Sequence, residues 1–325
     1  MNFEEFKQRL IDRMNERYEA EFECHEVLKN NGIHLTGITG RLPGQDAAPN
    51  IYINELYTRY QMGMTFEAVA SIVEAEYVNA KPQQFGAMNV SDFAEVKDKI
   101  VMRLINKELN SELLKSVPYV SVASNMAVTY RILYNKTDTD VTTALIDNQI
   151  FEDWNISPDE LHQLALQNTE RIFPAQIDSL KNMILKKIPE EMQQEAREEL
   201  EAIGETEIEM YVLTNDSGIN GAAAILYPSV QEHISKEFGN ILILPSSVHE
   251  LMLVPHPMED DLQFFENLVK EANETAVGQS DFLSNSIYRI EGNELVNVNQ
   301  YDSVIEQAIE EGNEQFPEED LELEM

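Results

Sequence analysis

Apolar residues in the first third of the chain recur mainly at intervals of three and four, the spacing of an amphipathic helix. This pattern predicts a helix over residues 3–18. Two further helices are predicted to begin after the capping residues Thr65 and Ser91, and the second of them is expected to reach Leu104. The start of the chain is therefore predicted to be largely helical.

A β-hairpin interrupts these helices. It is predicted from the segments 21–28 and 33–41, which flank Asn31-Gly32, a pair typical of tight hairpin turns. The short apolar run 51–53 fits a third strand, but it also fits the start of the following helix.

Beyond Pro118 the apolar runs are shorter and richer in residues that favour strands. Several of these runs are separated by turn-forming residues, so neighbours are expected to pair as hairpins. Strands are predicted over residues 128–134, 141–146, 210–213, 241–244, 251–254, 282–290 and 294–298. The run 222–227 is left open between helix and strand, because periodicity alone does not assign a short apolar run.

Helices are predicted between these strands. Ser157, Pro158 and Glu160 form a strong helix start, with a capping hydroxyl, proline at the first helical position and glutamate three residues after the cap. Similar reasoning predicts helices over residues 189–204, 228–239 and 262–272. The mixture predicts an α+β fold with a helix-and-hairpin region (1–112), a larger mixed sheet-and-helix region (113–313) and an acidic disordered tail (314–325).

Charge and composition limit the partners and the cellular locations that can be expected. The formal net charge of −36 repels phosphate backbones, so direct nucleic-acid binding is not expected, whereas a basic protein or peptide is a suitable partner. No apolar stretch approaches the roughly 20 residues that span a bilayer, so no membrane association is expected. The single cysteine, Cys24, and an acidic start without a signal-peptide pattern predict a cytoplasmic location.

The segment 246–250 carries candidate catalytic chemistry. Ser246 and Ser247 supply hydroxyls, His249 an imidazole and Glu250 a carboxylate, which are the groups of a serine hydrolase. Closeness in sequence is not the required geometry, however, and no nucleophile-elbow motif is present. The competing interpretation is a hairpin turn in which the serine hydroxyls bond loop amides.

A metal site is not predicted. His249-Glu250 resembles half of a zinc-hydrolase motif, but Leu253 stands where the second histidine belongs. His256 could join His249, although two histidines without a third ligand are weak evidence. No cofactor is predicted either.

The segment 215–221 offers a candidate ligand-binding loop between a strand and a possible helix. Its candidate residues are Asn215, Asp216, Ser217 and Asn220, and its backbone amides could hold an anion. The glycine spacing matches neither a P-loop nor a dinucleotide fingerprint. The competing interpretation is a tight turn with Asn220 or Ser217 as a cap.

Three segments resemble an uncharacterised bacterial family, domain of unknown function fifty-six eighty-eight: YVLTNDSGINGAAAILYP, ILILPSSVHELMLVP and WNISPDELHQLALQNT. The central and C-terminal halves also look like distant relatives of a second uncharacterised bacterial family, UPF zero-three-fifty-four. These resemblances imply a bacterial cytosolic protein of α+β build. They indicate no particular activity, because neither family has one that could be carried over.

With no complete catalytic constellation, the leading functional hypothesis is a non-enzymatic module that binds a protein or peptide. The first alternative is a hydrolase that uses Ser247, His249 and Glu250. The second is an acidic mimic of nucleic acid, which requires carboxylates spaced along one elongated face.

Overall fold

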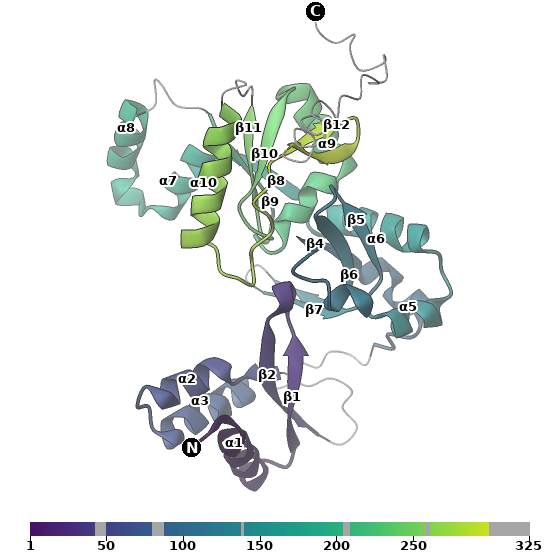
Figure 1. Ribbon diagram of the computed structural model, residues 1–325, viewed down its shortest axis with the longest axis vertical. Coiled ribbons are helices and arrows are strands. Elements are labelled where there is room, and N and C mark those ends of the chain that lie inside the picture. The colour runs from purple at the N-terminus through teal and green to yellow at the C-terminus, as the bar shows by residue number, and fades with distance from the viewer. Residues whose placement is uncertain are drawn as a thin grey trace, which may run out of the picture.

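The computed structural model describes residues 1–42, 50–79, 88–137, 140–203, 209–255, 257 and 261–298. The chain forms an N-terminal unit and a larger body that contains two antiparallel sheets (Figure 1). The α+β class predicted from the sequence is confirmed. The predicted tail and His256 lie outside the described residues. The predicted boundary after residue 112 stays a prediction.

The N-terminal unit packs helices on a small sheet. Its sheet has the order β1-β2-β3, and its core lies between this sheet and the helices, with Phe6, Leu10 and Val73 fully buried. Its elements are α1 (Phe3–Arg17), β1 (Glu21–Leu28), β2 (His34–Arg41), β3 (Asn50–Tyr52), α2 (Asn54–Gln61) and α3 (Phe66–Asn79). The predicted first helix and hairpin are confirmed, and the run 51–53 is mainly strand.

The middle of the chain forms a 4-stranded sheet of order β4-β6-β5, in which β7 also pairs with β6. Helix α6 covers one face and contacts the main core. Ser157 caps α6 as predicted, because its hydroxyl accepts a hydrogen bond from the Glu160 N–H. The elements are α4 (Phe93–Val96), β4 (Ile100–Asn106), β5 (Tyr119–Val122), β6 (Met126–Lys136), β7 (Val141–Leu145), α5 (Asn148–Trp154) and α6 (Pro158–Ile172).

The predicted helix after Ser91 is wrong in its cap and its length. Asp92 caps a single turn, and β4 follows from Ile100 to Asn106. The apolar residues of β4 alternate between two buried clusters, with Leu104 in the main core and Ile105 on the opposite face. A strand buried on both faces shows no clean alternation, so a helical spacing can be found within it.

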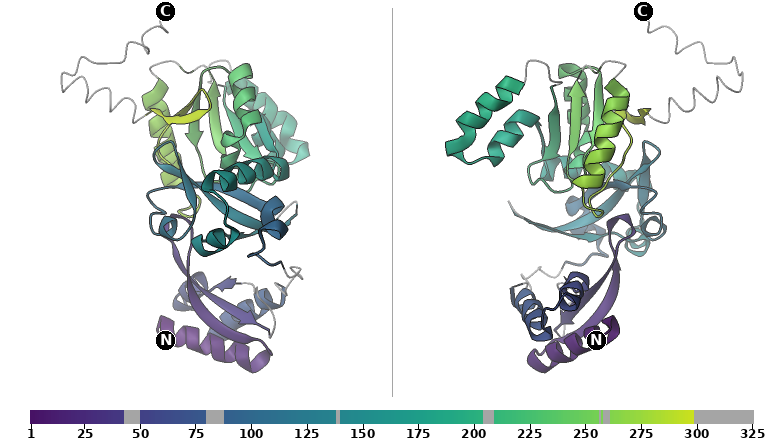
Figure 2. Two further views of the ribbon diagram at one scale, coloured as in Figure 1. Left: turned by 90° about the vertical axis from the view of Figure 1, so that its right-hand side faces the viewer. Right: turned by 60° about the vertical axis from the view of Figure 1, so that its left-hand side comes forward.

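The last part of the chain forms a 6-stranded sheet of order β13-β12-β10-β11-β9-β8. Helix α10 covers one face, and the main core lies on the other (Figure 2). The segment 222–227, which the sequence left undecided between helix and strand, is largely a 3-10 helix, η5 (Gly221–Leu226). The other elements are β8 (Ala175–Ser179), α7 (Leu180–Lys187), α8 (Gln193–Ile203), β9 (Tyr211–Asn215), α9 (Pro228–Glu237), β10 (Ile241–Pro245), β11 (Leu251–Pro255), α10 (Asp261–Thr275), β12 (Tyr288–Glu291) and β13 (Glu294–Asn297).

The predicted hairpin of β10 and β11 is confirmed, with Ile243 opposite Leu253. The last hairpin is also present, but its first strand begins at Tyr288 rather than at residue 282. Among the helices of the described ranges, none is both long and apolar enough to cross a membrane.

Candidate functional site

The loop that follows β9 is closed by its own polar groups. The buried Asn215 side chain accepts hydrogen bonds from the Ser217 N–H and hydroxyl through Oδ1, at 3.0 and 2.8 Å, and donates through Nδ2 to the Ile219 carbonyl. The Ile219 N–H donates to the Ser217 hydroxyl, and the Gly218 N–H donates to the Asn215 carbonyl. Asp216 forms an ion pair with Lys136 at 2.7 Å. The amides that could have held an anion are therefore already bonded.

The turn between β10 and β11 is closed in the same way. The Ser247 hydroxyl is buried and accepts the backbone N–H of His249 at 3.0 Å, and the Ser247 N–H donates to the Glu250 carbonyl. Within the described residues, no hydrogen bond joins Ser246 or Ser247 to the His249 imidazole. At Ser247 the turn thus has the form of the competing interpretation, because the hydroxyl bonds a loop amide, whereas the Ser246 side chain makes no hydrogen bond within the described residues.

The two predicted motifs meet at His249. Its Nδ1 accepts the Asn220 N–H at 3.1 Å, and its Nε2 lies 3.5 Å from the nearest Asp281 oxygen. Its carbonyl accepts the Thr214 hydroxyl at 2.8 Å. A general base needs one ring nitrogen that faces a nucleophile. Both nitrogens of His249 have other neighbours, so this arrangement lacks the geometry of a hydrolase triad.

Gly221 shows how tightly these loops pack. A Cβ at this position would lie 2.5 Å from the His249 carbonyl oxygen and 2.8 Å from the Asn215 nitrogen. Only glycine fits between the two backbones. In the described part of the chain, no group of three or more His, Cys, Asp or Glu side chains could hold a metal ion.

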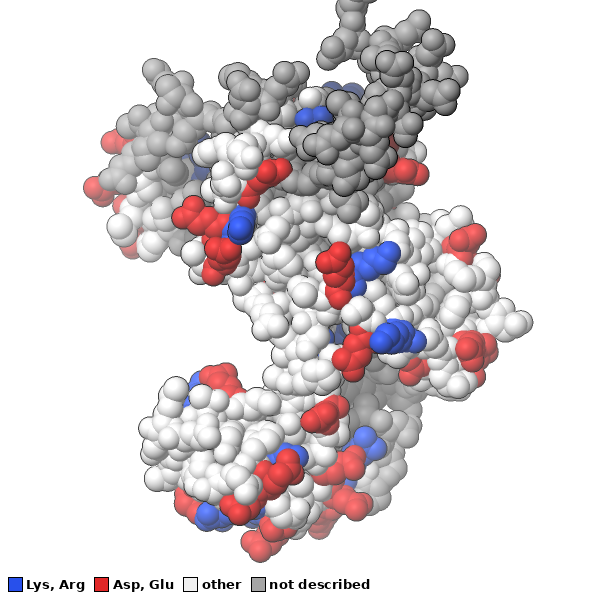
Figure 3. Space-filling model, viewed as in Figure 1, with Lys and Arg blue, Asp and Glu red and all other residues white. Residues whose placement is uncertain are grey.

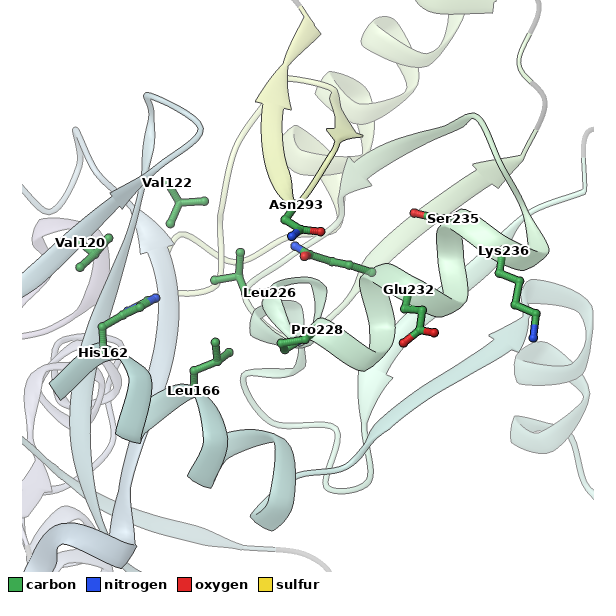
Figure 4. Close-up of a pocket in the computed structure, with 11 residues that line it drawn as sticks. Val120, Val122, His162, Leu166, Leu226, Pro228, Glu232, Ser235, Lys236 and Asn293 are labelled. Carbon is green, nitrogen blue, oxygen red and sulfur yellow. The ribbon is translucent and has the colours of Figure 1, made fainter. Parts of the chain in front are cut away.

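A different place in the body offers an open cleft of about 890 Å³ (Figure 4). It lies between α6 and β5 on one side and η5, α9 and the β12–β13 turn on the other. One part of its lining is apolar and the other part is polar. The lining residues are Val120, Val122, His162, Leu166, Leu226, Pro228, Gln231, Glu232, Ser235, Lys236 and Asn293. A size and mixture of this kind are typical of ligand sites.

His162 reaches from α6 into the apolar end of the cleft. Its Nδ1 lies 3.0 Å from the hydroxyl of Tyr130, a residue buried in the main core. Burial raises the pKa of Tyr130, so the hydroxyl stays protonated and donates to Nδ1. Burial lowers the pKa of His162, against the opposing field of Asp159. The neutral ring then carries its proton on Nε2, which is left as a donor for a ligand.

Gln231 is the most unusual residue of the cleft. It is only 8% exposed, on the buried side of α9 beside Val230 and Ile234. Its carboxamide lines the cleft and has no hydrogen-bond partner among the described residues. Its carboxamide atoms stay accessible to solvent in the cleft. A carboxamide that faces a hollow without a protein partner is free to bond a ligand.

Strand β5 forms one wall of the cleft and is an edge strand. It pairs with β6 on one side, and no described strand pairs with it on the other. Val120 and Val122 line the cleft, whereas Tyr119, on the opposite face, is 43% exposed. Alternate residues of an edge strand direct their N–H and C=O groups outward. The cleft therefore borders a row of backbone donors and acceptors.

Sequence reasoning did not identify this cleft, although one indication was available. Gln231 stands between the apolar residues Val230 and Ile234 on a predicted helix, and a polar residue on a buried face is informative. The other walls come from segments far apart in the chain, such as β5 and Asn293, so the hollow itself had no local pattern.

A profile described as "Family of unknown function (DUF5688)" matches residues 3–291 of this chain. No curated protein and no solved structure matches the chain. The first resemblance found in the sequence is thereby confirmed. The similarity to the second uncharacterised family is not shown and stays a prediction.

Proposed function

Because the chain belongs to this family of unknown function, which brings no activity with it, we propose from the cleft alone that the protein binds peptides. The occupant is an extended segment that adds to the free edge of β5. The observation that carries the proposal is the carboxamide of Gln231, a nearly buried residue that lines the cleft beside that edge and whose side chain has no partner within the described residues.

The geometry of strand addition fits the cleft. A peptide beside β5 gains backbone hydrogen bonds from the edge, and every second side chain projects to the same face as Val120 and Val122. These side chains enter the apolar end, near Leu166 and Leu226. Gln231 and Asn293 are then in place to bond peptide amides or side chains.

The charge of the protein favours a basic peptide. The formal net charge of −36 attracts cationic segments from a distance and accelerates their association. The cleft itself is mixed, because Glu232 and Lys236 both line it. Specificity within the cleft therefore comes from the apolar pocket and the amides, whereas the overall field acts on the encounter. We propose that this binding takes place in the cytosol.

The alternative functions have less support. The contacts of His249 differ from those of a hydrolase base, as described above. A nucleic-acid mimic requires a continuous row of carboxylates. On the face shown in Figure 3, acidic residues are scattered and interspersed with Lys and Arg.

A display library of ten-residue peptides, followed by calorimetry with the selected sequences, tests the proposal. We expect Gln231→Met to weaken binding at least about tenfold, because the hydrogen bonds between its carboxamide and the peptide are lost. The matched control is Gln263→Met on the exposed face of α10, which should bind as the wild type does. Equal affinities for both variants would contradict the proposal.

Backbone N-methylation tests the binding mode. In strand addition, only alternate peptide amides face β5. Methylation of one set of alternate amides should abolish binding, and methylation of the other set should leave it nearly unchanged. If the two sets behave alike, the peptide is not bound as an added strand.

A further inference from the structure

Two arginines lie next to each other on the 4-stranded sheet, away from the cleft. Val101 of β4 pairs with Arg131 of β6, and Arg103 is two residues farther along β4. Arg103 and Arg131 therefore point to the same face as diagonal neighbours, with Cα atoms roughly 7–8 Å apart. This is the face opposite the main core, since Met102 and Leu104 point the other way.

Neither arginine has an ion-pair partner within the described residues. Arg131 donates through Nε to the Thr143 hydroxyl at 2.6 Å and through Nη2 to the Thr143 carbonyl at 3.4 Å. The Nε of Arg103 is buried and has no acceptor. The chain contains 59 acidic and only 23 basic residues, so unpaired neighbouring arginines run against its composition and need a specific explanation.

The pair is electrostatically costly without a ligand. Burial, together with the smaller effect of the Arg103 charge, lowers the pKa of Arg131 to about 10. Burial also lowers the pKa of Arg103, and the field of Asp281 opposes this only in part. An anion placed between the two guanidinium groups would relieve their repulsion and supply the hydrogen-bond acceptor that the Arg103 Nε lacks.

Other polar groups lie close to the pair. Arg131, Thr143 and Asn220 line a hollow of about 10 Å³, which has room for a single oxygen atom. Asp281 also faces His249. The loop 215–221 that sequence reasoning singled out thus borders Arg131.

We propose that Arg103 and Arg131 bind the phosphate group of a small ligand, with one phosphate oxygen in the hollow beside Arg131 and Thr143. Two guanidinium groups match the charge of a phosphate, and their planar arrays of donors suit its oxygens. This site is separate from the peptide cleft and does not depend on it.

Titration with inorganic phosphate at constant ionic strength tests the site, with thermal unfolding as the readout. Phosphate should raise the melting temperature of the wild type above that in chloride. Arg103→Gln and Arg131→Gln should each lose at least about tenfold in apparent phosphate affinity, because each removes a charged hydrogen bond. Arg59→Gln is the control, since Arg59 forms only an exposed pair with Glu55. A response that is absent, or equal in all four proteins, would overturn the proposal.

A second measurement uses only the wild type and so does not depend on how the variants fold. In a spectrum of arginine Nε–Hε groups, phosphate should shift the signals of Arg103 and Arg131 and leave that of Arg59 in place. Acetate at the same ionic strength is the second arm. Equal shifts with acetate would show a carboxylate site and overturn the assignment to phosphate.

Discussion

The loops 215–221 and 246–250, which meet at His249, differ from the cleft around Gln231 in whether their polar side chains are already hydrogen-bonded within the protein. In the loops, the side chain of Asn215 and the hydroxyl of Ser247 are bonded to neighbouring backbone groups. In the cleft, the nearly buried Gln231 has no partner among the described residues. The loops have the residue types of an active site, but the side chains of Asn215 and Ser247 are already bonded within the protein. The cleft lacks those residue types, but its Gln231 carboxamide is not bonded within the described residues.

We infer from this difference that polar groups left without a protein partner in a hollow are a better guide to a site than the residue types of a motif. Most polar side chains in the interior of a folded protein have a partner, so a nearly buried side chain that lacks one is informative. We therefore treat the loops as structural elements and the cleft as the candidate binding site. Substitutions in the two regions should therefore have effects of opposite kind.

Gly221→Ala should produce the largest effect. The added Cβ would meet the His249 carbonyl oxygen at 2.5 Å, and backbone atoms cannot yield easily. We expect the free energy of unfolding to fall by about 3 kcal/mol, as for severe overpacking. Peptide affinity of the folded fraction should not change. Urea denaturation measures the first quantity and calorimetry the second.

Gly278→Ala is the control for this substitution. Its Cβ would meet only Asp281 Oδ2 and Ser280 Oγ, both at 3.9 Å, which is ordinary contact. A similar loss of stability in both variants would mean that the loops are not packed as described.

Gln231→Met should have a smaller effect on stability and the opposite sign. Gln231 is only 8% exposed and its carboxamide has no partner among the described residues, so an apolar group of similar size should raise the free energy of unfolding by up to about 1 kcal/mol. Binding should weaken at the same time. A loss of stability would show that Gln231 has a structural partner, and the contrast between the two regions would fail.

The sequence predicted elements better than it predicted sites, for physical reasons. Helix α6 was predicted because Ser157 and Pro158 act locally on the helix start. Strand β4 was missed because both of its faces are buried, so its pattern lacks the alternation of a half-exposed strand. The cleft needs β5, α6 and α9 together, and no local pattern encodes such a meeting.

Ser247→Ala should have a moderate effect. The Ser247 hydroxyl accepts the backbone N–H of His249 at 3.0 Å, and its loss leaves that donor without a partner. We expect a loss of about 1 kcal/mol in stability by chemical denaturation. Ser246→Ala is the matched control and should be nearly neutral, because no hydrogen bond of its side chain is present within the described residues. If both variants were equally stable, the turn would not depend on its hydroxyl.

His162 should give the smallest effect, seen as a dependence of stability on pH. Burial lowers the pKa of His162 from its usual 6.5, so the folded protein takes up a proton less readily than the unfolded chain. The stability that the neutral ring contributes to the folded state is complete above pH 6.5 and is lost as the pH falls through the lowered pKa. Protonation also removes the acceptor for the Tyr130 hydroxyl. The effect is small because the ring remains half-exposed to solvent in the cleft.

Melting temperatures of the wild type and His162→Gln between pH 7.5 and 5 would measure this contribution. The wild type should lose more stability over this range than the variant, whose side chain does not titrate. A basic peptide bound in the cleft should make the difference larger, because it disfavours a positive charge on the ring. Parallel pH profiles, with and without peptide, would show that His162 does not face the ligand and would leave Gln231 and Asn293 as the polar anchors of the cleft.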